Sequence, residues 1–151
     1  MTDVTFRPAR EEDLAEIVAL MADDPLGATR ESKKGSLAPY ARAFEEIDAD
    51  PNNLVIVADD GDRVVGCLQV TFIANLSFKG GTRALIEAVR VADSHQGQGL
   101  GRAIMEHAVA LAKERQCRMV QLTSNKQRPD ALKFYERIGF QPSHVGFKLY
   151  L

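Results

Sequence analysis

The sequence predicts an α/β (α+β) fold in which a mixed β-sheet is flanked by helices. Short stretches rich in Val, Ile and Leu indicate strands, whereas longer stretches with an apolar residue every three or four positions indicate helices. The two kinds of stretch are interleaved without strict strand–helix alternation, which favours a mixed sheet. The chain has 151 residues, of which 45% are hydrophobic, so residues 1–151 are expected to form a single domain.

The N-terminal third is predicted to contain a strand at residues 4–7, a helix at 11–21 and a second helix at 37–47. Pro8 ends the strand because it has no backbone N–H to donate. Both helices carry apolar residues three or four positions apart, which gives each one an apolar face. Between them, residues 28–36 are polar and are expected to form a loop.

The middle of the chain predicts a hairpin and a further strand. Strands at 54–58 and 64–73 are separated by the sequence Asp-Asp-Gly-Asp at residues 59–62, a strong turn signal. Residues 75–82 contain a pair of glycines and are expected to form a loop. The strand at 83–91 follows.

The C-terminal part is predicted to contain a helix at 99–115, a strand at 118–124, a helix at about 130–138 and a last strand at 144–151. Gly139 is expected to end the helix before it, because glycine readily adopts the left-handed conformation found after helix C-termini. The sequence therefore predicts six strands and four helices.

Residues 96–102 read Gln-Gly-Gln-Gly-Leu-Gly-Arg, where the strand at 83–91 gives way to the helix at 99–115. Glycines at a helix N-terminus let an anion approach the unpaired backbone N–H groups, so the stretch predicts a phosphate or pyrophosphate site. A Walker loop is excluded because Arg102 follows Gly101 at the position where that loop has lysine. A dinucleotide-binding fingerprint is excluded because its third glycine would fall on residue 102, which is arginine. The alternative is a flexible turn that caps a helix.

Several motifs occur together in one order around this loop. A strand with Val89-x-Val91 is followed by Q-x-x-G-x-G, a long helix, a strand, a helix bearing Phe134-Tyr135, and then Gly139-Phe140. Between residues 84 and 140 this order resembles the GCN5-related N-acetyltransferase (GNAT) family. The resemblance implies a twisted, mostly antiparallel mixed sheet of six to seven strands with about four helices, and acetyl-CoA as co-substrate.

The resemblance also implies which residues hold acetyl-CoA. The pyrophosphate is expected at the loop, and the pantetheine arm along the main chain of Val89 and Val91. Many family members have an asparagine seven residues before the tyrosine, where this chain has Arg128. Asn125 or Arg128 is expected to make the corresponding contact; the alternative is that the contact is absent. The predicted cofactor-binding residues are Val89, Val91, Gln96, Gly97, Gln98, Gly99, Leu100, Gly101, Arg102, Asn125, Arg128 and Phe134. The 3′-phosphate is expected near Arg102, Lys126, Arg128, Lys133 and Arg137, whose alternative role is to form a solvated face.

Two residues are candidates for proton transfer. Tyr135 occupies the position of the tyrosine that lies beside the CoA sulfur in the family, and a phenol of pKa ~10 is protonated at neutral pH and can donate to a departing thiolate. Its alternative role is that of a core tyrosine. Glu87 interrupts an apolar run and is expected either to be desolvated and accept the amine proton, or to pair with Arg83 or Arg90.

These residues predict an acetyl-CoA-dependent N-acetyltransferase that moves an acetyl group to a primary amine by direct transfer in a ternary complex. The acceptor is expected to be a small molecule or a peptide. An acyltransferase using another acyl-CoA shares the same residues, and a non-catalytic acyl-CoA sensor is the further alternative, although a sensor needs neither Glu87 nor Tyr135.

Composition and residue spacing give no support for several other classes of protein. A net charge of −2 gives no reason to expect nucleic acid as a partner, and no apolar run reaches the ~18 residues of a membrane span. Cys67 and Cys117 are expected to be buried free thiols in a cytoplasmic protein. The three histidines have no metal-ligand spacing, so no metal is expected, and no triad partners are visible for Ser94 or Ser124. Either a monomer or a homodimer is expected.

Overall fold

The computed structural model describes residues 3–31 and 34–151. The chain forms two compact units, one spanning residues Met1–Gln121 and the other Leu122–Leu151. The first unit holds the sheet and the glycine loop. The second holds the helix that bears Tyr135.

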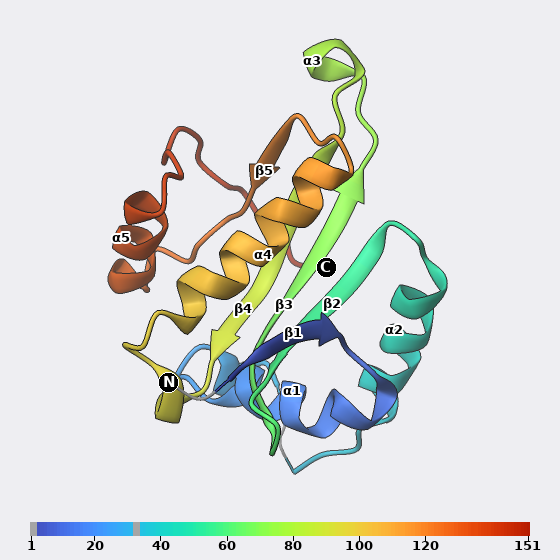
Figure 1. Ribbon diagram of the computed structural model, residues 1–151, viewed down its shortest axis with the longest axis vertical. Helices are drawn as coiled ribbons and strands as arrows, with labels where there is room; N and C mark the ends of the chain where they lie inside the picture. Colours follow the sequence, from blue (N-terminus) through green and yellow to red (C-terminus); the bar gives the residue numbers. More distant parts are fainter. Residues whose placement is uncertain (1–2, 32–33) are drawn as a thin grey trace. The chain divides into compact units, whose positions relative to one another are not determined.

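The first unit is built on one five-stranded sheet, shown in Figure 1, with the strand order β1-β2-β3-β4-β5. Its strands are β1 (Thr5–Pro8), β2 (Asn53–Asp59), β3 (Val64–Ile73), β4 (Arg83–Val91) and β5 (Met119–Gln121). The first four pair antiparallel, and β5 pairs parallel to β4. The prediction of a mixed, mostly antiparallel sheet is confirmed. The sheet has one strand fewer than the six that the residues predicted.

The helices of the first unit lie close to their predicted positions. They are α1 (Leu14–Ala22), α2 (Ala38–Ala49), the short α3 (Ser77–Gly80) and α4 (Leu100–Glu114). Three 3₁₀ turns accompany them, η1 (Glu11–Asp13), η2 (Gly27–Thr29) and η3 (Asp93–His95). The predicted first helix therefore begins with a 3₁₀ turn. In α3, Phe78 and Lys79 have left-handed backbone angles, so this segment is a tight turn within the predicted loop.

Helices cover the sheet on both faces. Cys67 of β3 packs in a buried cluster with Ile17 of α1 and Val57 of β2, and Phe44 of α2 packs against that cluster. The neighbouring residue Gly66 points to the opposite face, where a Cβ atom on it would lie 3.7 Å from Leu100 Cδ2 of α4. The apolar cores on the two faces thus fix α1 and α2 on one side of the sheet and α4, with the glycine loop at its start, on the other.

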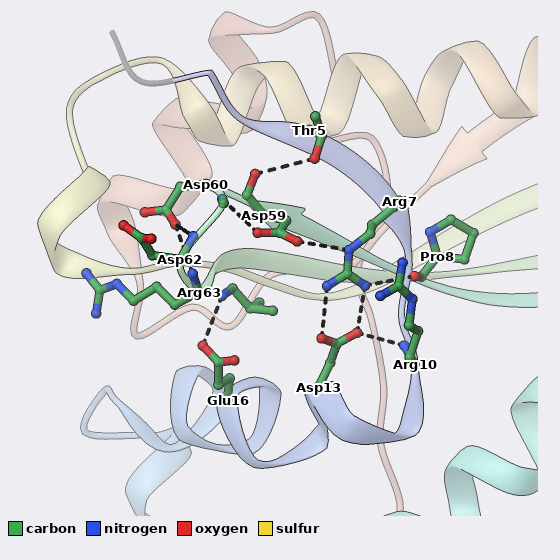
Figure 2. A network of polar contacts seen from close by, with 12 residues as sticks. Thr5, Arg7, Pro8, Arg10, Asp13, Glu16, Asp59, Asp60, Asp62 and Arg63 are labelled. Carbon is green, nitrogen blue, oxygen red and sulfur yellow. Dashed lines mark hydrogen bonds and ion pairs between the residues drawn. The ribbon is translucent and has the colours of Figure 1, made fainter.

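A charged network joins β1 to the start of α1, as Figure 2 shows. The Arg7 guanidinium donates to both carboxylate oxygens of Asp13, at 2.8 and 3.0 Å, and its Nε donates to Asp59 at 3.1 Å. The Arg10 backbone N–H also donates to Asp13, at 2.7 Å. Asp13 is buried, and the hydrogen bonds from Arg7 hold the pKa of its carboxyl group below the usual range.

We expect Asp13→Asn to lower the free energy of unfolding by about 2 kcal/mol, because the half-buried Arg7 guanidinium would keep only one of its two carboxylate partners, Asp59. Asp13 has a lowered pKa in the folded state, so its stabilisation is present above the unfolded value of ~3.9 and is lost as pH falls below it. The difference between wild type and variant should therefore shrink below about pH 4. Urea unfolding across pH measures this, with the exposed Asp62→Asn as control; equal losses in both variants would contradict it.

The second unit contains α5 (Pro129–Arg137) and extended chain. Gly139 follows α5 with φ +106°, and the Phe140 N–H donates to the Tyr135 carbonyl at 3.0 Å, so the predicted stop at Gly139 is confirmed. The predicted strand at 144–151 is wrong for this chain taken alone, since no residue from 138 to 151 belongs to a helix or strand. The predicted strand at 118–124 is shorter than expected, because only Met119–Gln121 pair with β4.

Candidate functional site

The glycine loop forms a tight turn between η3 and α4. Gly97 has φ +76° and Gly99 has φ +81°, both in the region that favours glycine, and Gly99 is the N-cap of α4. The first backbone hydrogen bond of the helix runs from the Ala103 N–H to the Gly99 carbonyl at 3.0 Å. The N–H groups of residues 100–102 precede this bond and lie at the positive end of the helix dipole. A Cβ on Gly97 or Gly99 would meet nothing within 4 Å, so the space in front of the loop fits an anionic group.

The two glutamines of the loop use their side chains to shape it. Gln96 Nε2 donates to the Val91 carbonyl and to Asp93 Oδ1, both at 3.2 Å, and Gln98 Nε2 donates to the Ser94 carbonyl at 3.2 Å. The two side chains therefore stabilise the turn by hydrogen bonds to the residues just before it. The Gln96 backbone N–H also donates to the Asp93 carbonyl, at 3.3 Å, so a role in holding a phosphate falls to the backbone N–H of Gln98.

The first turn of α4 divides its residues between the core and solvent. Leu100 is buried and contributes to the core between α4 and the sheet. Arg102 is exposed, and its Nε donates to Glu106 at 2.8 Å, one turn along the helix. Because this pair is solvent-exposed, it stabilises the helix only slightly and leaves the Arg102 guanidinium accessible to a ligand.

A polar chain links the loop to the β2–β3 hairpin. Arg63 Nη2 donates to Ser94 Oγ at 2.5 Å, Ser94 Oγ lies 2.8 Å from His95 Nδ1, and His95 Nε2 lies 3.6 Å from Asp60 Oδ2. Ser94 thus has His and Asp companions, contrary to the sequence-based expectation. The order is not that of a nucleophilic triad, in which serine contacts Nε2 and the carboxylate contacts Nδ1. The contacts instead fasten the glycine loop to the hairpin.

Strand β4 contains a bulge next to Glu87. Pairing between β3 and β4 is regular as far as Gln69 opposite Glu87 and resumes at Cys67 opposite Arg90, so one residue of β3 faces two of β4. Within the bulge Ala88 has φ +54°, a conformation that costs free energy for a residue other than glycine. The bulge changes which residues of β4 face α1 and which face α4. No glycine marks it, so the sequence carried no signal for it.

Glu87 is exposed on the face of the sheet that carries α1 and α2. The prediction that its carboxylate is desolvated is therefore wrong, because the side chain is open to solvent in the described part of the chain. Within residues 3–31 and 34–151, Glu87 makes no ion pair or side-chain hydrogen bond, so the alternative pairing with Arg83 or Arg90 is not formed. The carboxylate is thus available to a ligand.

A row of polar side chains lies beside Glu87 on the same face. Gln69 is the cross-strand partner of Glu87, and its Nε2 donates to Asn53 Oδ1 at 3.2 Å. Thr71 Oγ1 donates to the same oxygen at 2.8 Å. Sequence reasoning missed this row, although Gln69 and Thr71 interrupt the apolar run of β3 at alternate positions. That interruption is the signal that could have revealed it.

Val89 and Val91 are half-buried on β4, directly before the loop. Val91 pairs with Gly66 across the sheet, and its carbonyl accepts the hydrogen bond from Gln96. Glu87, Val89, Val91 and the loop therefore all belong to one continuous strand–turn–helix segment of the first unit.

The other predicted site residues lie in the second unit. Asn125 Oδ1 accepts from the Gln127 N–H at 2.8 Å, so its side chain shapes the turn before α5. Arg128 immediately precedes α5. The rings of Phe134 and Tyr135 are 5.2 Å apart between centroids, and those of Tyr135 and Phe140 are 6.0 Å apart. The basic residues predicted to meet the 3′-phosphate, apart from Arg102, are also in this unit.

Both cysteines are free, as predicted, although Cys117 is only half-buried. Burial raises the pKa of the Cys67 thiol to about 12, so it is not a thiolate nucleophile at neutral pH. Among the described residues, no three His, Cys, Asp or Glu side chains are grouped so as to hold a metal ion. No helix in the described part of the chain is long and apolar enough to cross a membrane.

Comparison with known proteins decides the family. Residues 14–140 match the family model described as acetyltransferase (GNAT) family. This chain belongs to the GNAT acetyltransferase family. The family uses acetyl-CoA as its co-substrate, and the strand–loop–helix segment from Glu87 to Arg102 corresponds to the part of the chain in which the sequence predicted acetyl-CoA to bind.

Individual relatives agree with the family. The streptothricin acetyltransferase of Streptomyces lavendulae is 36% identical over 103 residues, which are 68% of this chain and 51% of that protein, so the chain spans about half the length of this relative. A crystal structure of a transcriptional regulator from Bacillus halodurans C-125 is 49% identical, with a TM-score of 0.95 over 99% of this chain and 100% of that one. A protein described as a predicted acetyltransferase from Clostridium acetobutylicum, solved with acetyl-CoA, shares the fold at 20% identity and a TM-score of 0.75, over 98% and 96% of the two chains.

Proposed function

We propose that this GNAT acetyltransferase transfers the acetyl group of acetyl-CoA directly to a primary amine in a ternary complex. The observation that carries the proposal is the segment from Glu87 to Arg102. It places an exposed carboxylate, with no partner among the described residues, on the same strand that leads into an open, glycine-lined helix N-terminus. In this proposal, a group that accepts a proton and a group that binds pyrophosphate belong to one continuous strand–turn–helix segment.

Binding is divided among three groups in this proposal. The N–H groups at the start of α4, with Arg102, hold the pyrophosphate. The main chain of Val89 and Val91 pairs with the amides of the pantetheine arm, much as an added strand pairs with a sheet edge. Asn125, Arg128 and Phe134, with the basic side chains of the second unit, contact the rest of the cofactor.

Two residues move protons in the proposed reaction. Glu87 accepts the proton that the ammonium group must lose before nitrogen can attack the thioester carbonyl. As the carbon–sulfur bond breaks and the amide forms, Tyr135 donates its phenolic proton to the sulfur, so that free CoA leaves as a thiol. Because Glu87 is exposed, its access to the solvent lets it release the proton after each turnover.

The proposed class of amine acceptor rests on the charge at Glu87 and on the substrate named for one relative. The free acceptor atoms at Glu87 favour a cationic amine, since a carboxylate attracts an ammonium group. The streptothricin acetyltransferase is 36% identical over 68% of this chain, so streptothricin belongs in the first panel of acceptors, together with simple polyamines and a peptide with a free amine. The free thiols Cys67 and Cys117 support a reducing, cytoplasmic setting for the reaction.

We expect acetyl-CoA to raise the melting temperature, and ATP and NAD to leave it unchanged. At 100 times its dissociation constant, a ligand that binds only the folded protein stabilises it by about 2.7 kcal/mol, or about 5–10 °C for a chain of this size. A thermal scan with each nucleotide measures this. A shift with NAD and none with CoA would overturn the proposed use of the loop.

Turnover separates the proposal from its alternatives. Release of free thiol from acetyl-CoA in the presence of one of the amines supports an acetyltransferase. Faster release from another acyl-CoA would identify a different acyl donor. Binding of CoA without any turnover across the amine panel would favour a non-catalytic sensor.

A further inference from the structure

The side-chain amide of Asn53, at the start of β2, has a fixed orientation. The Asn52 N–H donates to Asp50 Oδ1 at 2.8 Å, and Asn53 Nδ2 donates to Asp50 Oδ2 at 3.0 Å. These two hydrogen bonds hold the pKa of Asp50 below its usual range, so the group is a carboxylate at neutral pH and can only accept. The nitrogen of the Asn53 amide therefore has to face Asp50, which leaves its oxygen for donors on the neighbouring strand β3.

The amide of Asn53 in turn sets the orientation of Gln69. Asn53 Oδ1 accepts from Gln69 Nε2 at 3.2 Å and from Thr71 Oγ1 at 2.8 Å, so both of its lone pairs are used. Because an accepting oxygen requires a donor opposite it, Gln69 has to present its amide nitrogen, and not its oxygen, to Asn53. The oxygen of the Gln69 amide, Oε1, is thereby directed away from Asn53.

Gln69 Oε1 is left as an acceptor next to the carboxylate of Glu87. Among the described residues Gln69 Oε1 accepts no hydrogen bond, and it is not fully buried. Glu87 lies directly opposite Gln69 on β4, and the Cβ atoms of such a cross-strand pair are about 5 Å apart. Two acceptor groups, one charged and one neutral, are thus held side by side, and no described residue donates to either of them.

We propose that Gln69 determines acceptor specificity by accepting an N–H from the same amine whose proton Glu87 removes. The inference rests on the proposed acetyl transfer. A primary ammonium group has three N–H bonds: one proton passes to the Glu87 carboxylate, one N–H is held by Gln69 Oε1, and the lone pair set free on nitrogen attacks the thioester carbonyl. A hydroxyl group has a single O–H and leaves Gln69 unpaired, and a quaternary ammonium has no N–H at all. The site should therefore favour primary amines over both.

Asn53 is a positioning residue in this proposal. It does not touch the amine, but its hydrogen bond keeps the Gln69 amide from turning over. A turned amide would present N–H groups to an ammonium ion, and two donors cannot pair with each other. Asn53 therefore decides that Gln69 offers an acceptor and not a donor to the ligand.

The first test observes the side-chain amide resonance of Gln69 by NMR in the ¹⁵N-labelled wild-type protein. The resonance is assigned from its loss in Gln69→Leu. Spermidine is the probe, and its fully quaternised analogue, which keeps the charge but has no N–H, is the control. CoA is added in place of acetyl-CoA, so that no acetyl group can be transferred. We expect spermidine to shift the resonance and the analogue to leave it unchanged. Equal shifts with both, or no shift with spermidine, would overturn the proposal.

Variants test the same contact through the affinity for spermidine, measured by calorimetric titration. Gln69→Leu should weaken binding about 10- to 100-fold, the loss expected for one hydrogen bond to a charged group. Thr71→Val is the matched control: Thr71 donates to the same Asn53 oxygen but lies opposite Leu85, so its change should leave the affinity unaltered. Asn53→Leu should weaken binding in the wild-type background but not in Gln69→Leu, because it acts only through Gln69. Equal losses in Thr71→Val and Gln69→Leu, or additive losses in the double variant, would contradict the proposal.

Thiol release from acetyl-CoA in the presence of spermidine separates this inference from the proposed function. If spermidine shifts the Gln69 resonance but is not acetylated, the contact with Gln69 is supported and acetyl transfer to this amine is contradicted. If spermidine is acetylated equally well by wild type and Gln69→Leu, acetyl transfer is supported and the role of Gln69 is contradicted. The NMR test needs only the wild-type fold and one assigned resonance, so it decides the question even if Asn53→Leu fails to fold.

Discussion

Gly99→Val is expected to weaken acetyl-CoA binding by at least about 100-fold while the chain stays folded. Gly99 has φ +81°, and a β-branched residue in that conformation is strained, so the turn must distort. A Cβ at Gly99 would also project into the open space in front of the helix N-terminus. Losing two charge-assisted hydrogen bonds to the pyrophosphate is worth about 3–6 kcal/mol, which more than accounts for the expected loss. Calorimetric titration with CoA measures the affinity, and circular dichroism monitors the fold.

Gly80→Val is the matched control for this experiment. Gly80 has φ +74°, and a Cβ atom on it would have a single neighbour within 4 Å, the Asn75 carbonyl oxygen at 3.9 Å, so the substitution strains the backbone in the same way. It precedes β4, whereas Gly99 follows that strand, so the two sites lie toward opposite ends of β4. Equal loss of CoA affinity in both variants would mean that strain, and not the loop, causes the effect. Unchanged CoA affinity in a folded Gly99→Val protein would show that the loop is only a turn and does not bind CoA.

The glycine loop shows why one part of the site could be predicted from sequence. Glycines with positive φ and the start of an amphipathic helix are both local features. They depend only on residues close together in the sequence, so the sequence can predict them. The hairpin at residues 59–62 was predicted for the same reason and joins β2 to β3 as expected. The spacing of apolar residues at 11–21 also predicted a helix with one apolar face, and α1 buries Leu14, Ile17 and Val18.

Features that depend on pairing between distant segments were not predictable in this way. The bulge at Ala88 arises from the register between β3 and β4, and alanine gives no sign of a positive φ. The link from Asp60 to His95 joins residues that are far apart in the sequence. The segment 144–151 has the pattern of a strand, but whether a strand forms depends on a neighbour that the pattern does not specify.

Glu87 illustrates how register can change a chemical prediction. Its apolar neighbours in sequence suggested burial, yet neighbours along a strand point to the opposite face, so they say little about the surroundings of Glu87. Its surroundings are set by its cross-strand partner Gln69 and by its exposed position on the face of the sheet that carries α1 and α2. An exposed carboxylate can still serve as the base if the amine is bound next to it, because proximity increases the rate of proton transfer.

We expect Glu87→Gln to lower kcat/KM at neutral pH by a factor within the ~10²–10⁴ range of general base catalysis. Glutamine keeps the size of the side chain but cannot accept the amine proton. The loss should shrink as pH approaches the pKa of the amine, about 10 for a primary alkylamine such as that of lysine, because the nucleophile then arrives deprotonated. The measurement is a pH–rate profile of wild type and variant with the same amine, under conditions in which chemistry limits the rate.

Glu114→Gln is the control for the loss of one negative charge. Glu114 is exposed at the end of α4, on the opposite face of the sheet, and its change should leave the profile unaltered. Since Glu87 has no ion-pair partner in the described residues, its variant should also keep the wild-type melting temperature. A rate loss that is the same at every pH would assign Glu87 to binding of the ammonium group and leave deprotonation to an ordered water. Full activity at neutral pH would remove Glu87 from the mechanism altogether.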